Sequence, residues 1–117
     1  MSDGRVKLTG NELLRIFEAL SNPYRLKLIS ILTKERKYVS QLAREMKMSR
    51  PLLYMHLRRL EEAGIVSSQL ELSEDGKAMK YVQIVPFELH LTHELIADAA
   101  ETLTVDRKTK QADDEEV

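Results

Sequence analysis

Residues 39–66 read VSQLAREMKMSRPLLYMHLRRLEEAGIV and contain two helical patterns separated by a short polar turn. Ser49 is a favourable N-cap for the second pattern, a helix over about residues 50–63 that tolerates Pro51 in its first turn and ends at Gly64. The first pattern predicts a helix of about two turns, from the apolar residues Val39, Leu42, Ala43 and Met46. This stretch therefore predicts a helix-turn-helix.

Two more helices are predicted upstream of it. Residues 10–20 carry one apolar stripe and favour a helix with one buried side. Ser21 or Asn22 then caps a second helix over about residues 23–33, with Pro23 near its first position, where a missing N–H costs nothing. This helix is apolar on more than one side, which predicts a central place in the core. The residues concerned are Leu26, Leu28, Ile29, Ile31 and Leu32.

A β-hairpin is predicted to follow the helix-turn-helix. Its first strand is indicated by an alternation that puts Val66, Leu70 and Leu72 on one side. A turn over about residues 73–78 separates it from a second strand over about residues 79–85. A hairpin in this position makes the winged form of the motif. The predicted fold class is therefore mainly α with a small β-hairpin (α+β), a winged helix-turn-helix.

A long last helix is predicted over about residues 87–104, after Pro86. Leu89, Ile96 and Leu103 repeat every seven residues and suit pairing with a second copy. The alternative is that this stripe covers the chain's own core. The expected parts of the chain are a flexible N-terminus at 1–9, a winged helix-turn-helix domain at 10–104 with dimerisation helices at both ends, and a disordered charged tail at 105–117.

Basic and acidic residues are segregated along a chain whose net charge is only −1. Residues 25–59 hold ten Lys or Arg and two Glu, whereas residues 60–104 hold two Lys and nine Asp or Glu. A basic stretch of this kind is typical of a surface that binds a polyanion such as DNA. The alternative is a solvated helix pair whose charges balance across the fold.

Several classes of function are excluded or disfavoured. The chain has no cysteine, which excludes thiolate zinc sites and cysteine nucleophiles. Glycine-rich phosphate loops and the HExxH and GxSxG motifs are absent, so we expect no enzyme, no catalytic residue and no cofactor. Neither a signal peptide nor a run of about 18 apolar residues is present, so we expect a cytoplasmic protein without a membrane span.

The predicted helix at 50–63 has a core side and a solvent side. A step of about 100° per residue puts five residues on the core side, namely Leu52, Leu53, Leu57, Leu60 and Ala63. On the other side, Arg50 and Arg58 can pair bidentately with guanine, and Tyr54 can contact a thymine methyl or a phosphate. Pro51 and Met55 lie beside them.

Further basic residues are expected to hold phosphates without reading bases. Arg44, Lys47, Ser49 and Arg59 fit that role around the second helix, and Lys77 or Lys80 adds a weaker backbone contact from the hairpin. The candidate DNA-binding residues are therefore Arg44, Lys47, Ser49, Arg50, Pro51, Tyr54, Met55, Arg58, Arg59, Lys77 and Lys80.

His56 falls on the core side of the same helix, at about 340°. We interpret it as a partly buried, hydrogen-bonded structural histidine. A catalytic role would need a nucleophile or a partner carboxylate, and no motif supplies one.

Three stretches of the chain resemble the ArsR/SmtB winged-helix repressors. They are LSNPYRLKLISIL at 20–32, the stretch at 39–66 quoted above, and MKYVQIV at 79–85. The shared features are a small polar turn with Pro and Arg before the second helix, HL in the recognition helix and AG followed by two apolar residues after it. The resemblance covers about residues 11–104. MarR-like and other small winged-helix regulators share the layout.

The resemblance implies a sequence-specific transcriptional regulator, a repressor that reads an inverted-repeat operator with helix 50–63 in the major groove. It also implies a homodimer formed through the first and last helices. The family usually has Ser where Tyr54 stands and often a polar residue at Met55, so the base preference is expected to differ from that of relatives.

The resemblance also bears on metal sensing. Many relatives hold a metal through cysteines near the third helix, but Tyr38 and Ser40 stand at those positions here. Others use four ligands on the last helix, and the matching residues are Glu88, His90, Glu101 and Thr104. Eleven helical residues rise about 16.5 Å, so His90 and Glu101 could meet only across a dimer. We expect no metal, with a site of Glu88, His90 and Glu101 across two copies as the alternative; the inducer is unknown.

A second class of function also fits the sequence, a winged-helix protein-interaction module without DNA-binding activity. The net charge near zero and the acidic pair Glu74 and Asp75 at the hairpin turn favour this alternative. The basic stretch at 25–59 favours DNA.

Overall fold

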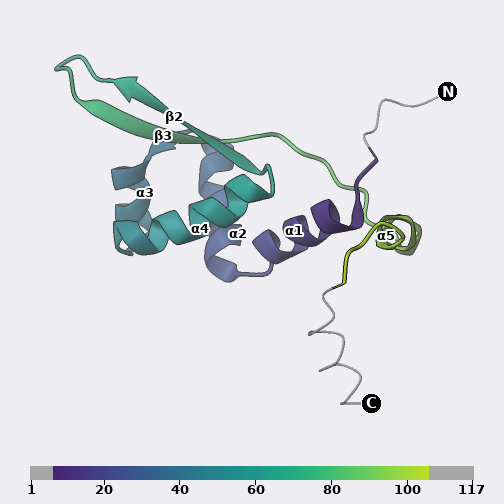
Figure 1. Ribbon diagram of the computed structural model, residues 1–117. Helices are drawn as coiled ribbons and strands as arrows, with labels where there is room; N and C mark the ends of the chain where they lie inside the picture. The colour runs from purple at the N-terminus through teal and green to yellow at the C-terminus, as the bar shows by residue number, and fades with distance from the viewer. Residues whose placement is uncertain (1–6, 106–117) are drawn as a thin grey trace. The chain divides into compact units, whose positions relative to one another are not determined.

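The structure is a computed structural model that describes residues 7–105. Its elements, drawn in Figure 1, are α1 (Gly10–Leu20), α2 (Pro23–Lys34), β1 (Lys37–Tyr38), α3 (Val39–Met46), α4 (Arg50–Glu62), β2 (Val66–Leu72), β3 (Ala78–Ile84) and α5 (His93–Ala100). The strands form one antiparallel sheet of order β1-β3-β2. The predicted winged helix-turn-helix fold is confirmed. Among the described residues, 15–88 form one compact unit, and 7–14 together with 89–105 form another.

The core of the 15–88 unit is formed by α2, α3, α4 and the base of the β2–β3 hairpin. Leu28, Leu42, Leu53, Leu60 and Val82 have no exposed surface. Around them lie further buried residues, namely Ala19, Leu32, Val39, Ala43, Met46, Leu57, Ile65 and Val66. This packing holds one side of α4 and leaves the other side free.

The helix boundaries follow from local capping. The Asn22 side chain accepts hydrogen bonds from the N–H groups of Tyr24 and Arg25, at 2.9 and 3.4 Å, and so begins α2. Ser49 Oγ accepts the N–H of Leu52 at 3.3 Å and begins α4. Both caps were predicted from the sequence and are confirmed.

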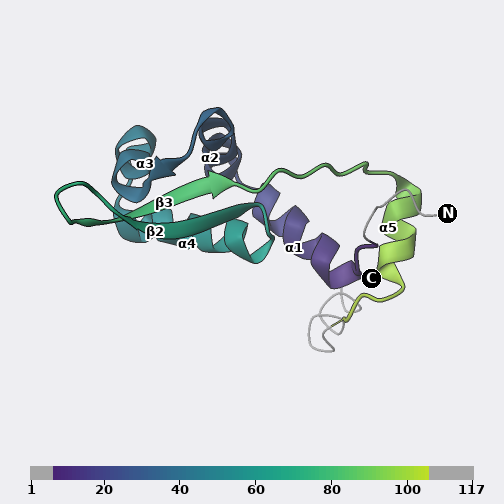
Figure 2. The same ribbon diagram turned by 90° about the horizontal axis from the view of Figure 1, so that it is seen from above.

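The β2–β3 hairpin, residues 66–84, is called the wing below. Its base is buried and its tip is not: Val66 is 3% exposed, whereas Leu70 and Leu72 on the same strand face are 69% and 76% exposed. The tip is exposed because the hairpin extends past α3, where no helix covers it (Figures 1 and 2). The alternation of apolar and polar residues along β2 therefore predicts buried side chains correctly only at the base of the wing.

Three details differ from the sequence-based expectations. Lys37 and Tyr38 form the short strand β1, which pairs with β3, where only a polar break was expected. Leu52 was expected on the core side of α4 but is 40% exposed, because it lies at one edge of that side in the first turn. Leu26 of α2, expected in the core, is 52% exposed.

The last helix is much shorter than predicted. α5 begins at His93, because Thr92 Oγ1 accepts the N–H of Leu95 at 3.0 Å and caps the helix there. The preceding residues alternate apolar Phe87, Leu89 and Leu91 with polar ones, a period of two that favours the extended chain seen in Figure 2. The predicted helix at 87–104 is therefore wrong, and its seven-residue stripe does not lie on one helix.

In the second unit, residues 7–14 pack against the segment that follows α5. The N–H of Gly10 donates to Thr102 Oγ1 at 2.8 Å, and Asn11 Nδ2 donates to Thr104 Oγ1 at 3.3 Å. A Cβ at Gly10 would lie 2.4 Å from the carbonyl oxygen of Ala99, so this approach requires glycine. The predicted flexible N-terminus and charged tail fall largely on residues 1–6 and 106–117, which lie outside the described residues.

Candidate nucleic-acid interface

The helix α4 presents a row of polar side chains opposite its buried side. Arg50, Tyr54 and Arg58 follow one another at intervals of four residues and are exposed, so they lie along one row of the helix surface. Pro51 and Met55 lie beside this row, and Met55 is 58% exposed. All five were predicted on the solvent side, and all five lie there.

A groove of about 560 Å³ runs between the start of α4 and the wing. It is lined by Tyr38, Val39, Ser40, Arg50, Tyr54, Leu70, Lys77, Ala78, Met79 and Lys80. Lys80 Nζ lies 5.1 Å from the centre of the Tyr54 ring, a cation–π distance. The fold thus brings four of the predicted DNA-binding residues together: Arg50, Tyr54, Lys77 and Lys80.

Three other predicted residues surround the turn before α4. Arg44 is exposed in the last turn of α3, and Lys47 ends that helix in a left-handed conformation with φ of 55°. Ser49 Oγ accepts a hydrogen bond as the N-cap of α4, which leaves its hydroxyl hydrogen free to donate. The positive end of the α4 dipole lies at the same place, and this favours an anion there.

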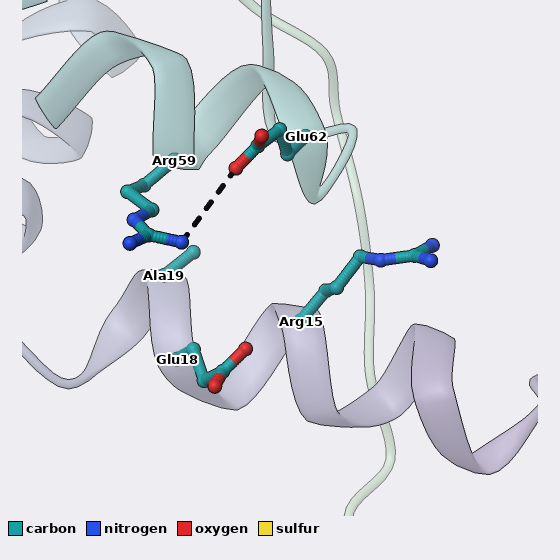
Figure 3. A pocket seen from close by; sticks show the side chains of 5 residues that line it. All are labelled: Arg15, Glu18, Ala19, Arg59 and Glu62. Atoms are coloured by element: carbon teal, nitrogen blue, oxygen red, sulfur yellow. Dashed lines mark ion pairs between the residues drawn. The ribbon is translucent and has the colours of Figure 1, made fainter. Parts of the chain in front are cut away.

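Arg59 lies away from this groove. Figure 3 shows its side chain on the part of α4 that faces α1, where a separate pocket of about 460 Å³ is lined by Arg15, Glu18, Ala19, Arg59 and Glu62. Arg59 Nη1 is 3.9 Å from Glu62 Oε1. The structure therefore does not bring Arg59 to the other candidate residues.

The wing turn carries the acidic residues that the sequence flagged. Asp75 accepts a hydrogen bond from the Ser73 hydroxyl. This bond, with a smaller contribution from the N–H of Lys77, holds the pKa of Asp75 below its usual value. The turn is therefore negatively charged at neutral pH, while Lys77 and Lys80 supply the positive charge on the groove side.

Sequence reasoning missed several groove residues. Tyr38 and Ser40 were considered only as positions of an absent metal site, and Leu70 and Met79 only as parts of strands. Tyr38 reaches the groove because β1 pairs it with Tyr81 of β3. A strand of two residues leaves no periodic signal in the sequence, so nothing marked this placement in advance.

His56 is held by a hydrogen-bond network that links three helices. The guanidinium of Arg25 donates from Nε to the carbonyl of Ala19 at 2.8 Å and from Nη2 to that of Glu18 at 3.1 Å. Its Nη1 lies 3.1 Å from His56 Nδ1. Because a guanidinium has only donors, Nδ1 accepts and the imidazole proton lies on Nε2.

Burial, and then the charge of Arg25, lowers the pKa of His56 below its ordinary value. The side chain is 5% exposed, and the Tyr24 ring lies 5.7 Å from it. The prediction of a buried, hydrogen-bonded structural histidine is confirmed.

No cluster of three or more His, Asp or Glu suitable for a metal ion occurs within residues 7–105. Glu88 and His90 precede α5 and Glu101 follows it, so the expected spacing of His90 and Glu101 along one helix is wrong.

No helix in the described part of the chain is long and apolar enough to cross a membrane.

Comparison with known proteins places this architecture in a family. A family model described as "Bacterial regulatory protein, arsR family" matches residues 22–68. An uncharacterized HTH-type transcriptional regulator of Methanocaldococcus jannaschii is 40% identical over 85 residues, covering 73% of this chain and 88% of the relative.

Two solved structures share the fold. The homodimeric winged helix-turn-helix DNA-binding domain Mb0332 of Mycobacterium bovis has a TM-score of 0.57 at 20% identity, covering 78% of this chain and 74% of that one. The transcriptional repressor BigR of Xylella fastidiosa has a TM-score of 0.54 at 21% identity, with coverage of 78% and 82%. The family model, the sequence relative and the winged helix-turn-helix fold agree, and the chain belongs to the ArsR family of transcriptional regulators.

Proposed function

We propose that the protein is a dimeric repressor that reads an inverted-repeat operator with α4 in the major groove. The observation that carries this proposal is the exposed row of Arg50, Tyr54 and Arg58 on a helix whose other side is buried in the core. A major groove is about 12 Å wide and admits such a helix, and Arg pairs bidentately with guanine there.

Base reading and phosphate binding fall to different residues. Arg50, Tyr54 and Arg58 read base edges, with Met55 contacting thymine methyl groups. Arg44, Lys47 and Ser49 bind the backbone beside the N-terminus of α4, and Lys77 and Lys80 bind it from the wing. The groove between α4 and the wing supports this division, because it joins base-reading and phosphate-binding residues.

Exposed apolar side chains support a dimer. In the unit of residues 7–14 and 89–105, Leu14, Leu91 and Ile96 are 44%, 54% and 43% exposed. Three exposed apolar side chains in so small a unit favour association with a second copy. The homodimeric state of the Mycobacterium bovis domain favours the same assembly. A two-fold dimer places its recognition helices about 34 Å apart and so reads an inverted repeat.

Selection of bound duplexes from a random DNA pool, followed by sequencing, tests the reading of DNA. We expect an enriched inverted repeat. Changing Arg50, Tyr54 and Arg58 together to Ala removes two bidentate pairs from each half-site, each pair worth about 1–3 kcal/mol, so the specific affinity of the dimer falls by more than about 100-fold. The double change Arg15→Ala and Lys34→Ala removes the same charge elsewhere on the surface and serves as the matched control. A triple variant that still selects the same sequence would overturn the assignment of the reading face.

Oligomeric state and the direction of regulation need separate measurements. Sedimentation should give a dimer, and Ile96→Asp should shift it to monomer, whereas Asp98→Lys, at an exposed position on the other side of α5, should not. Transcription in vitro from a promoter that overlaps the selected site should fall when the protein is added. A rise in transcription would contradict the repressor role.

One observation favours a second function, a protein-interaction module. Leu70 and Leu72 are largely exposed on the wing, next to the acidic turn at Glu74 and Asp75. Failure to bind any duplex, at low as well as moderate salt, would replace the DNA proposal with this one.

A further inference from the structure

Arg36 lies between α2 and β1 and contacts both strands of the wing. Its Nη1 and Nη2 donate to the two carboxylate oxygens of Glu71 on β2, at 2.5 and 3.2 Å. Its guanidinium carbon lies 4.0 Å from the centre of the Tyr81 ring on β3. A planar guanidinium can make a bidentate ion pair and stack on an aromatic ring at the same time, whereas a Lys ammonium cannot.

The groups on either side of Arg36 extend this contact. Tyr81 packs edge-on against Tyr38, with ring centres 5.5 Å apart and planes at 89°. Gln69 Nε2 donates to Glu71 Oε2 at 2.6 Å. The bonds from Arg36 and then from Gln69 lower the pKa of Glu71, which keeps it ionised at neutral pH. We call these five side chains the wing clamp.

The wing has little else to fix its direction beyond its base. The strand β1 contributes only two residue pairs to β3. Past Glu71 the hairpin lies clear of the core, and Leu72 is 76% exposed. A segment with so few buried contacts reorients easily unless polar contacts hold it. Lys77 and Lys80, which line the groove beside Tyr54, lie on this outer part of the wing.

We propose that Arg36 and Glu71 are positioning residues that hold the wing at the angle at which Lys77 and Lys80 meet the DNA backbone. This inference rests on the proposed function. Neither residue lines the groove between α4 and the wing. Arg36 and Glu71 therefore act through the placement of the wing lysines.

The proposal makes a prediction opposite to that of simple electrostatics. Removing an acidic side chain from a DNA-binding surface normally raises affinity, because its repulsion of phosphate disappears. Glu71→Ala should instead lower affinity for the selected operator, by about threefold to tenfold, because it releases the wing. Glu74→Ala removes the same charge from an exposed position of the wing turn and should leave affinity unchanged or raise it. If both variants raise affinity equally, the proposal is overturned.

Salt dependence separates positioning from direct binding of phosphate. Each phosphate that the protein no longer neutralises reduces the slope of log K against log salt by about 0.9. Arg36→Ala and Glu71→Ala should each lower affinity and reduce this slope, because the wing lysines leave the phosphates. In a Lys77→Ala/Lys80→Ala background, Arg36→Ala should change neither affinity nor slope. A further fall of the slope in that background would mean that Arg36 itself binds phosphate, and would overturn the positioning role.

Rescue and folding controls complete the experiment. The exchange of Arg36→Glu with Glu71→Arg restores the ion pair but not the contact of Arg36 with Tyr81, so it should recover part of the affinity that either single change loses. Circular dichroism melting should show all variants folded. No recovery would count against the clamp. If the wild-type protein enriches no DNA sequence, the proposed function fails first. If Lys80→Ala weakens binding but Glu71→Ala strengthens it, the positioning inference alone fails.

Discussion

The helix α4 and the outer wing, residues 70–80, form the two walls of one groove but are held by different forces. Leu53, Leu57 and Leu60 bury one side of α4 completely or nearly so, at 0%, 1% and 0% exposure. On the outer wing, Leu70 and Leu72 are exposed, and an ion pair with an aromatic contact takes the place of a core. The helix α4 is therefore held by the core of the 15–88 unit, whereas the outer wing has no core of its own and depends on polar contacts.

The largest expected effect lies on the buried side of α4. Leu57→Ala leaves a cavity under the helix, and large-to-small changes at such sites cost about 2–5 kcal/mol. Denaturant unfolding followed by circular dichroism would measure the loss. A cost below about 1 kcal/mol would mean that the core closes around the gap, and α4 would then be held less firmly than the comparison requires.

The second effect depends on pH and concerns His56. In the folded state its pKa lies below the ordinary value of 6.5, whereas in the unfolded state it returns to that value. The unfolded chain therefore binds the proton first, and the unfolding free energy falls as the pH drops below about 6.5 and through the folded pKa. Above that window, His56 is neutral in both states and makes no pH-dependent contribution.

Unfolding between pH 8 and pH 5 would test this. The fall attributable to His56 should vanish in His56→Gln and persist in His93→Gln, whose imidazole is exposed. An identical pH profile in all three proteins would mean that the pKa of His56 is the same in the folded and unfolded states, and would contradict a buried imidazole that accepts from Arg25.

A smaller effect is expected at the N-terminus of α4. Ser49→Ala removes the Oγ that accepts the N–H of Leu52, and losing such a cap costs about 1 kcal/mol. Ser30→Ala, at an exposed position within α2, is the control and should change little. Equal stability of the two variants would indicate that water replaces the cap.

Sequence reasoning succeeded where one pattern was supported by local signals. For α4, the apolar spacing, Ser49 and Gly64 agree, and the predicted range differs from Arg50–Glu62 by one residue. For α5, apolar spacing stood alone. Residues 87–92 carry a period of two, and the capping residue Thr92 lies well inside the predicted helix. The capping residue Thr92, inside the predicted helix at 87–104, was the local signal that a shorter helix begins there.

The candidate site was predictable in its helical part and less so in the wing. Arg50, Tyr54 and Arg58 follow from helical periodicity, because four residues return to the same row. Arg36 and Glu71 are 35 positions apart, and the two become neighbours only through the pairing of β1, β2 and β3. Pairing between distant strands has no local signature in one sequence, so the wing clamp could not have been found without the structure.

The smallest expected effect is at the tip of the wing. Leu72→Ser changes an exposed side chain that packs against no core, so the unfolding free energy should stay within about 0.5 kcal/mol of the wild-type value. Val82→Ser, on the same strand pair but with no exposed surface, should cost several times more, because it buries a hydroxyl and leaves a gap. If Leu72→Ser destabilised the protein as much as Val82→Ser, the outer wing would have to be covered in solution. The leucines would then belong to an association surface, and the difference between α4 and the wing would lie in what covers each.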